Sequence, residues 1–487
     1  MSEAARLAPS GVNTSLVIRL TFVATLGGLL FGYDTAVISG AVSSIDAYFI
    51  DPLRLSETAR SSLSGWTISS ALLGCVIGAA LAGWISTALG RRGGLIIAAG
   101  LFLLGSIGSA VPEIGFGAIG RLGPGALWPF IVYRILGGVG VGIASMLSPL
   151  YIAEIAPSAV RGRLVSFNQL AIVGGILFVY FVNWFIASQG DESWLRTMGW
   201  RLMLASEAIP AAVFLLLLLF VPDTPRWLVL RGRSAEALAQ LSRVLGESEA
   251  RSIVSHIERT LVVRAGRLFS FGVPVVLVGI MISVFQQFVG INAVLYYAPL
   301  MFQNMGASTD SALLQTVVVG GANTIFTLVA IFTVDSWGRK PLLITGAVIM
   351  AVSMLVLGTL FSAHAVGLGA LVAVVCYIAG FALSWGPVAW VMLSEMFPNS
   401  IKGKAMGLAV AAQWIANLLV SASFKVLDGN STLNALFNHG FAYWIYGAMS
   451  VLAAVFVVRF VPETKGHRLE AIQDLWTPSP QQPRVTR

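Results

Sequence analysis

The sequence predicts an all-α polytopic membrane protein built from two similar six-helix halves. Three observations predict this: an apolar composition, recurrent apolar stretches of about 20 residues, and motifs that occur twice in the same order. Of the 487 residues, 57% are hydrophobic and only 11% are charged, and the mean hydropathy is +0.84. A soluble chain of this length needs more charge to cover its surface, so the composition excludes a soluble fold.

Twelve apolar stretches are long enough to cross a hydrocarbon core of roughly 30 Å as helices. They occupy approximately residues 17–39, 64–88, 94–112, 127–149, 166–188, 202–221, 270–298, 311–334, 341–362, 366–392, 404–425 and 440–460. The polar N-terminus lacks a small-residue cleavage site, so we expect the first stretch to be retained. Gly74 with Gly78, and Gly138 with Gly142, are small-xxx-small pairs, which predict close packing between spans.

Basic residues predict the orientation in the membrane. They concentrate in alternate loops, at Arg91, Arg92, Arg161, Arg163, Arg339, Lys340, Lys402, Lys404 and eight arginines between 226 and 267. By the positive-inside rule, these loops and both termini are expected in the cytoplasm. The net charge of +8 therefore reflects topology, and no nucleic-acid partner is expected.

Motifs of the first half recur about 240 positions later, as expected of parallel repeats. "LGRR" returns as "WGRK", "EIAPSAVRGR" as "EMFPNSIKGK", and "VPDTPRW" as "VPETKG". The repeat predicts an N-terminal bundle (1–222), a linker with short amphipathic helices (223–268), a C-terminal bundle (269–464) and a cytoplasmic tail (465–487). Such repeats hold a substrate site near the midplane and reorient around it.

The first half carries three ionisable residues deep in its predicted spans: Asp34, Arg134 and Glu207. A charge at this depth costs roughly 2.5–3.5 kcal/mol on insertion scales and requires a partner or a water-filled cavity. Asp34 and Arg134 are expected to pair, and with Glu207 nearby one acid could be protonated without leaving an unpaired charge. The alternative is an ion pair that only fixes helix packing. The four histidines have no Cys or carboxylate at metal-ligand spacing, so no metal site is expected.

The predicted spans of the second half hold amides and aromatic side chains in place of charges. Amides offer donors and acceptors together, which suits vicinal hydroxyls, and Trp faces suit the C–H face of a sugar ring. The alternative is that each amide only bonds to a neighbouring helix. Gln287 and Asn292 lie about 140° apart on a continuous helix, so they face one cavity only if the helix breaks between them. We expect this break at Gly290.

The motifs together resemble the sugar porter family of the major facilitator superfamily over nearly the whole chain. They are "GRR", "DSWGRK", "YRILGGVGVG", "PSAVRGR", "PDTPRW", "QQFVGINAVLYYAP", "SWGPVAWVMLSEMFP" and "PETKG". Within the family, "FGYDTAVISG", "LVSFNQ" and "AVAAQW" are most similar to the bacterial proton-coupled carriers of D-xylose. The resemblance implies the major facilitator fold, with two pseudo-symmetric six-helix bundles.

The resemblance also implies roles for individual residues. Sugar contacts would be Gln169, Gln286, Gln287, Asn292, Trp390 and Gln413, supported by Phe381, Tyr296, Asn323 and Trp414. Proton coupling would involve Asp34, Arg134 and Glu207. A cytoplasmic gate would include Arg92, Glu154, Arg161, Arg339, Glu395 and Lys402, with Glu154 paired to Arg161 and Glu395 to Arg339.

The function so implied is import of D-xylose with a proton, by a monomer in the cytoplasmic (inner) membrane of a bacterium. The proton would be the coupling ion, with no other cofactor. Alternatives are a hexose–proton symporter, a facilitative uniporter and a transport-inactive sugar sensor, although the short tail argues against a sensor. A membrane enzyme is not expected, because the spans contain no nucleophile elbow, "HExxH" or phosphate loop. Export of cations or drugs would predict acidic residues in the cavity of the second half. The predicted mid-span regions of that half contain none, which argues against this alternative.

Four residues depart from the family pattern. Thr87 and Ala88 stand where the family usually has an Asn or Asp and a basic residue. Lys402 replaces an Arg, which keeps the charge but loses bidentate geometry, so a weaker inner gate is expected. Ile176 stands near the expected pocket where xylose carriers have an amide and hexose carriers an apolar residue. This residue keeps the hexose alternative open.

Overall fold

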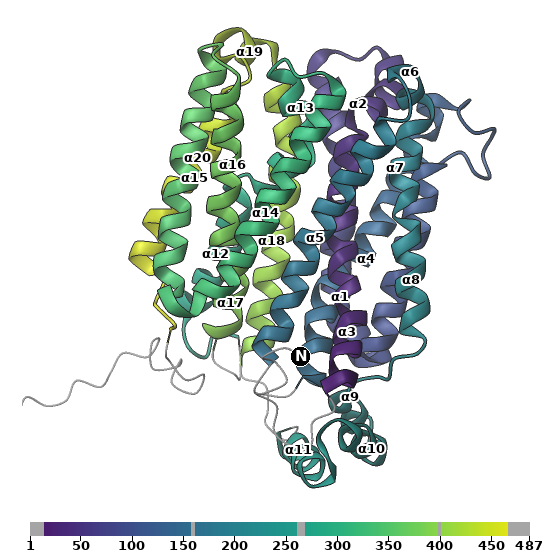
Figure 1. The fold of residues 1–487 in the computed structure, drawn as a ribbon, viewed down its shortest axis with the longest axis vertical. Helices are drawn as coiled ribbons and strands as arrows, with labels where there is room; N and C mark the ends of the chain where they lie inside the picture. The colour runs from purple at the N-terminus through teal and green to yellow at the C-terminus, as the bar shows by residue number, and fades with distance from the viewer. Residues whose placement is uncertain (1–13, 157–160, 261–267, 398–400, 466–487) are drawn as a thin grey trace, which may run out of the picture.

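The structure, a computed structural model, describes residues 14–156, 161–260, 268–397 and 401–465. Figure 1 shows two bundles of upright helices side by side, the first half in purple to blue and the second in green to yellow. Three short helices lie below the first bundle. In the described part of the chain, eleven helices are long and apolar enough to cross a membrane.

The described residues of the first half form eight α-helices, with short helical turns between them. The α-helices are α1 (Thr14–Val37), α2 (Val42–Ile45), α3 (Glu57–Ala110), α4 (Leu127–Ile155), α5 (Arg161–Ala187), α6 (Glu192–Trp194), α7 (Trp200–Ser206) and α8 (Ala208–Leu218). The turns are η2 (Ile38–Gly40), η3 (Asp46–Ile50), η4 (Asp51–Leu53), η5 (Gly123–Ala126) and η6 (Leu195–Gly199).

The linker and second half contain twelve described α-helices. They are α9 (Pro225–Leu230), α10 (Ser234–Leu245), α11 (Glu247–Thr260), α12 (Val273–Phe288), α13 (Ile291–Asn304), α14 (Thr309–Trp337), α15 (Arg339–Ser362), α16 (Leu368–Leu383), α17 (Trp385–Glu395), α18 (Lys402–Asp428), α19 (Ser431–Phe437) and α20 (Phe441–Phe460).

Helix α3 accounts for two of the twelve predicted spans. Its 54 residues would extend about 80 Å if straight, more than twice the hydrocarbon thickness. Gly90, inside "LGRR", has non-helical dihedrals (φ 82°, ψ 172°) and divides the helix into two spans. Gly338, inside the repeated "WGRK", has a similar conformation (φ 95°, ψ 160°) between α14 and α15.

The predicted glycine pairs bring the backbones of α3 and α4 together. A Cβ on Gly74 would lie 2.0 Å from the carbonyl oxygen of Ile135, and one on Gly78 would lie 2.2 Å from that of Val139. Gly138 approaches the carbonyl of Ala71 in the same way. The expected small-residue packing is therefore confirmed.

Three spans are interrupted near the middle of the molecule. The predicted break in the seventh span is confirmed, since α12 ends at Phe288 and α13 starts at Ile291 around Gly290. A second break, between α16 and α17, was not predicted; Pro387 explains it, because proline cannot donate to the carbonyl four residues back and clashes with it. Pro210 has the same effect at Glu207, between α7 and α8.

The linker helices form a small core of their own below the first bundle. It contains Leu228, Val229, Ala237, Leu241, Ala250 and Val254. Trp227 Nε1 donates to the carbonyl of Thr87 at 3.0 Å, and Arg231 donates to the carbonyl of Ala88. These bonds attach α9 to the part of α3 that precedes Gly90, at its end. In the predicted orientation this end lies in the cytoplasm.

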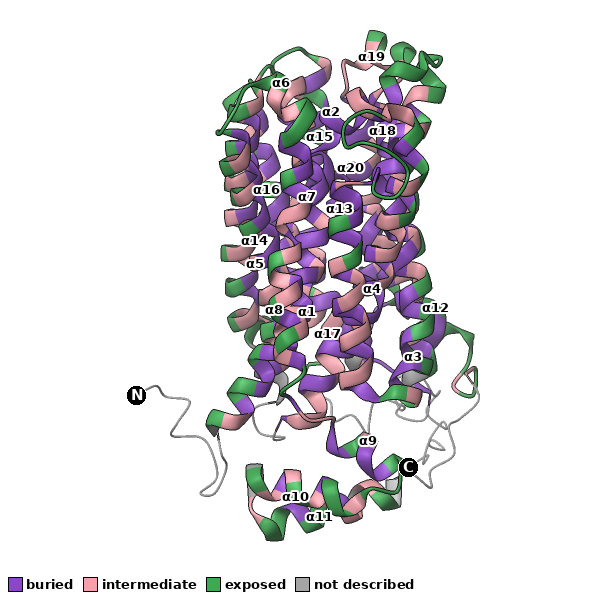
Figure 2. Ribbon diagram, turned by 90° about the vertical axis from the view of Figure 1, so that its right-hand side faces the viewer, coloured by how far each residue is buried: buried purple, intermediate pink, exposed green. Residues whose placement is uncertain are grey.

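Burial distinguishes the interior of the bundles from their outer surface. In Figure 2, buried residues lie between the helices, whereas exposed residues lie on the outer faces and at both ends. Many exposed side chains on the outer faces are large and apolar, among them Ile209 (71% exposed) and Phe332 (80%). Such a surface is suited to lipid.

Candidate functional site

A cavity of about 80 Å³ lies between the two halves. Helices α1 and α5 line it from the first half, and helices α12, α13, α14, α16, α17 and α18 line it from the second. All ten predicted sugar contacts line this cavity: Gln169, Gln286, Gln287, Asn292, Tyr296, Asn323, Phe381, Trp390, Gln413 and Trp414. A cavity needs about 10–15 Å³ to hold one water molecule. This cavity is several times larger, so it suits a small polar solute.

The break at Gly290 places three amides in one hydrogen-bonded chain. Asn292 Nδ2 donates to Gln287 Oε1 at 2.6 Å, and Gln287 Nε2 donates to Gln286 Oε1 at 3.3 Å. Gln286 Nε2 donates in turn to the carbonyl of Trp385, the first residue of α17, at 2.9 Å. The two interrupted spans are thereby connected at the cavity wall, where irregular backbone is tolerated in a membrane protein.

Tyr377 satisfies another backbone group freed by the same break. Its hydroxyl donates to the carbonyl of Val289 at 2.8 Å. Tyr180, on α5 of the first half, donates to the carbonyl of Leu295 on α13 at 2.7 Å. The second bond crosses between the halves and holds α13 close to the cavity.

Four further polar or aromatic residues line the cavity and were not among the predicted contacts: Phe31, Thr35, Thr327 and Asn417. Phe31 contacts Trp414 across the halves, with ring centroids 5.4 Å apart. Helical spacing was an available signal for Thr327 and Asn417, because each lies four residues after a predicted contact and shares its helix face.

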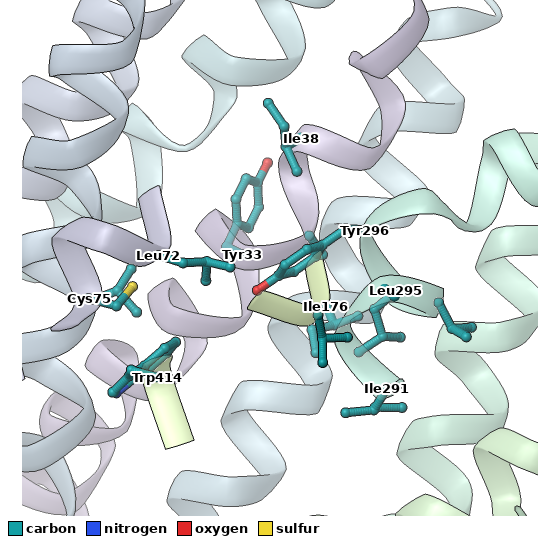
Figure 3. Packing of buried hydrophobic residues seen from close by; sticks show 14 of the residues in the cluster. Tyr33, Ile38, Leu72, Cys75, Ile176, Ile291, Leu295, Tyr296 and Trp414 are labelled. Carbon is teal, nitrogen blue, oxygen red and sulfur yellow. The ribbon is translucent and has the colours of Figure 1, made fainter. Parts of the chain in front are cut away.

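One side of the cavity is apolar. Ile176 lines it together with Ile172 of α5 and with Ile291 and Leu295 of α13. Figure 3 shows Ile176 beside Ile291, Leu295 and Tyr296, with Trp414 on the other side of the view. This wall offers no hydrogen bond to a solute, so it selects by shape.

The predicted pair of Asp34 and Arg134 is present in the first half. Arg134 Nη1 donates to Asp34 Oδ1 at 2.8 Å, and both side chains are 4% exposed. Glu207 is also buried, and its carboxyl lies within the electrostatic influence of both residues. Among the described residues, Arg134 Nε and Glu207 Oε1 have no hydrogen-bond partner. The cluster is therefore only partly satisfied, as expected of groups that exchange a proton.

A charge network lies at the linker-side end of the first half. Arg91 Nη2 donates to Glu154 Oε1 at 2.7 Å, and the hydroxyl of Thr224 donates to Glu154 Oε2 at 2.6 Å. Asp223 accepts from the backbone N–H of Arg91 at 3.0 Å. Burial raises the pKa of Asp223, against the effect of these N–H donors.

The second half repeats this network with the corresponding residues. Arg339 Nη2 donates to Glu395 Oε1 at 3.0 Å, and Thr464 donates to Glu395 Oε2 at 2.7 Å. Glu463 accepts from the backbone N–H of Arg339 at 3.1 Å and from that of Lys340 at 2.9 Å. Although burial opposes it, backbone N–H donors hold the pKa of Glu463 below its ordinary value. The sequence repeat thus corresponds to a repeated structural unit.

Glu154 has a partner that was not among the predicted pairs. Its described partner is Arg91, whereas Arg92 donates to the carbonyls of Leu218 (2.9 Å) and Leu219 (2.8 Å). Comparing the repeats would have found this, since Arg91 in "LGRR" corresponds to Arg339 in "WGRK". The side chains of Arg161 and Lys402 lie outside the described part of the structure, so their predicted roles stay predictions.

Comparison with known proteins gives consistent matches over nearly the whole length. The sequence model of the sugar (and other) transporter family matches residues 20–476. The D-xylose-proton symporter of Escherichia coli (strain K12) is 55% identical over 475 residues, which cover 96% of this chain and 97% of that protein. The glucose facilitated diffusion protein of Zymomonas mobilis is 49% identical, covering 95% of this chain and 98% of that protein.

Solved structures agree with these sequence matches. The E. coli xylose transporter XylE in a partially occluded inward-open conformation matches with a TM-score of 0.86 and 53% identity, covering 93% of this chain and all of that one. The proton:xylose symporter XylE bound to 6-bromo-6-deoxy-D-glucose matches with a TM-score of 0.84 and 55% identity, covering 96% of this chain and all of that one.

Proposed function

The chain belongs to the sugar transporter family, and we propose that it imports D-xylose together with a proton by alternating access. One observation carries the proposal: an uncharged cavity of amides and aromatic rings lies between the halves, apart from a buried ion pair in the first half. This separation suits a carrier in which a neutral solute and a proton occupy different sites.

The cavity supplies the chemistry for a monosaccharide. The amides of Gln169, Gln286, Gln287, Asn292 and Gln413 offer donors and acceptors to adjacent hydroxyls. The rings of Trp390 and Trp414 cover the C–H face of the sugar. A sugar hydroxyl that displaces a water from the cavity can make the hydrogen bonds that the water made. The positions of the amides therefore determine which sugar is bound.

Asp34 is the proposed proton carrier. Protonation removes its charge and weakens its attraction to Arg134, which changes the relative stability of the outward and inward states. Glu207 is the proposed second acid, since it lies near both residues. One charge moved through the membrane potential gains about 2.3 kcal/mol per 100 mV, which corresponds to roughly fifty-fold accumulation.

The positive-inside rule places the linker helices and both termini in the cytoplasm. The networks of Glu154 and Glu395 then lie at the cytoplasmic end of each half. We assign them to the inner gate, because each network ties together the helix ends on the cytoplasmic side of one half, which move as a unit when the cavity opens to this side.

A hexose is the second candidate substrate, and a specific observation favours it. The side chain of Ile176 lies in the cavity wall, where an amide would bind another hydroxyl. A relative 49% identical is named as a glucose facilitated diffusion protein. The two sugars are therefore to be tested together.

The test is uptake by the purified protein in proteoliposomes, with xylose and glucose, with and without an imposed proton gradient. The native protein should accumulate xylose only with the gradient, whereas Asp34→Asn should lose accumulation and retain counterflow. Asp51→Asn, which breaks an exposed ion pair with Arg60, is the control and should behave as the native protein. Uphill uptake by Asp34→Asn would contradict the coupling role, and preferential glucose uptake would replace xylose as the substrate.

A further inference from the structure

A buried ion pair joins the two halves at the end opposite the linker helices. Lys425 Nζ of α18 lies 3.0 Å from Asp46 Oδ2 of η3, with side chains 9% and 5% exposed. In Figure 1, α2 and α19, which adjoin these residues in sequence, lie at the top, whereas α9 to α11 lie at the bottom. In the proposed orientation the pair lies at the extracellular end.

The second oxygen of Asp46 is also engaged. Ser64 of α3 donates to Asp46 Oδ1 at 2.5 Å, so the carboxylate is held by one residue from each half. Hydrogen bonds to a charged group are stronger than those between neutral groups, so these two donors hold the carboxylate firmly. The pair is therefore stable only while α3 and α18 stay together.

The helices around the pair are in close contact. A Cβ on Gly65 would lie 2.5 Å from the carbonyl of Ala422 and 3.2 Å from Cβ of Lys425. One turn further along α18, Gly429 approaches the hydroxyl of Ser61, with 2.2 Å between that oxygen and a built Cβ. These distances show that α3 and the end of α18 are packed directly against each other beside the ion pair.

Other charged groups near the pair are already occupied within one half. Asp428, one turn after Lys425, contacts His439 at 2.9 Å and accepts from Asn304 at 3.0 Å, both in the second half. The pairs Asp34–Arg134 and Arg91–Glu154 likewise lie within the first half. Asp46 and Lys425 differ from them because separating the halves must break their contact.

We propose that Asp46 and Lys425 form a latch that holds the extracellular end closed and favours the state open to the linker side. The proposal rests on the proposed function, since it presumes alternating access. Removing one partner leaves an unpaired buried charge in the closed state, whereas the same charge is hydrated when the end is open. Loss of either partner should therefore shift the population toward the open end.

The test is a distance measurement by electron paramagnetic resonance between spin labels on the two halves. Leu55→Cys and Leu436→Cys carry the labels, because both side chains are exposed at this end. Cys376→Ala removes the exposed native thiol, while Cys75 is buried and stays. Asp46→Asn and Lys425→Gln should each increase the population of long distances severalfold, and the exchanged pair Asp46→Lys with Lys425→Asp should restore short distances.

Arg60→Gln is the matched control, since it breaks an exposed ion pair with Asp51 at the same end but within one half. It should leave the distances unchanged. Unchanged distances in the single variants, or no recovery in the exchanged pair, would overturn the latch. The measurement needs neither sugar nor a proton gradient, so a failure of xylose uptake and a failure of the latch are distinguishable.

Discussion

Asp34 and Glu113 are two buried carboxylates with different surroundings. Glu113 accepts two hydrogen bonds from Arg201, at 2.8 and 2.6 Å, and another from Tyr48 at 2.6 Å. Although burial opposes it, these donors hold the pKa of Glu113, in the loop after α3, below its ordinary value. Asp34 instead accepts from Arg134 and interacts with a second acid, Glu207, and in this cluster Arg134 Nε and Glu207 Oε1 have no hydrogen-bond partner. A cluster in which every polar atom has a hydrogen-bond partner suits a structural ion pair. A cluster in which some polar atoms lack a partner suits a proton carrier.

His439 provides a pH-dependent contribution to stability. Its hydrogen bond to Asp428 raises its pKa above 6.5, although burial opposes this. The contribution is fully present below pH 6.5 and is lost as the pH rises through the folded-state pKa. Thermal unfolding of the native protein and His439→Asn between about pH 5 and 8 should show a difference that shrinks with rising pH. His364→Asn is the control, since His364 is also at positive φ but exposed; a pH-independent difference for His439→Asn would contradict the assignment.

Two interrupted helices form part of the cavity wall. The breaks at Gly290 and Ser384 free backbone groups inside the membrane, and the side chains of Gln286 and Tyr377 satisfy some of them. Unsatisfied groups in hydrocarbon would cost several kcal/mol each, so the breaks depend on these partners. The amides that bind the sugar in our proposal therefore also stabilise the helices that present them.

Gly290→Ala should lower both the stability of the protein and its affinity for the sugar. Gly290 has φ +94°, and a Cβ would lie 2.5 Å from the ring of Tyr446. The left-handed conformation alone costs about 1–2 kcal/mol for a non-glycine residue, so we expect a lower unfolding temperature and weaker sugar binding by calorimetry. Gly321→Ala, in α14 with open space around it, is the control and should be neutral. Native-like binding by Gly290→Ala would show that the break tolerates a side chain.

The whole molecule is organised by its internal repeat. Arg91, Glu154 and Thr224 in the first half correspond to Arg339, Glu395 and Thr464 in the second, with the same hydrogen bonds. The cavity does not follow this symmetry, because its amides come mainly from the second half and the Asp34 cluster lies in the first. The repeat therefore serves the movement of the halves, whereas the differences between them serve binding and coupling.

The networks around Glu154 and Glu395 should contribute differently to the free energy of unfolding. Glu154 is 8% exposed and Glu395 is 26% exposed, so solvent compensates Glu395 better when its arginine is removed. Arg91→Ala should lower the free energy of unfolding by about 3 kcal/mol, and Arg339→Ala by less. Chemical unfolding in detergent measures both, with Arg251→Ala, from an exposed pair in α11, as the control. An equal or larger effect of Arg339→Ala would contradict this ranking.

The sequence by itself determined the helical membrane fold, the repeat, the break at Gly290 and ten of the residues that line the cavity. These follow from hydropathy, from glycine's conformational freedom and from residue types in short motifs, which are local properties of the chain. Pro387 was a local signal for the second break. Thr327 and Asn417 each lie four residues after a predicted contact, so two of the unpredicted cavity residues also had a local signal.

Only the tertiary structure decided which charges meet. Arg91, not Arg92, reaches Glu154, because the turn at Gly90 directs consecutive arginines to different elements. Asp46 meets Lys425 only because the two halves close at one end, with α3 packed against α18. Such pairs join residues far apart in the chain, and their distances depend on how whole bundles pack, which no local pattern encodes.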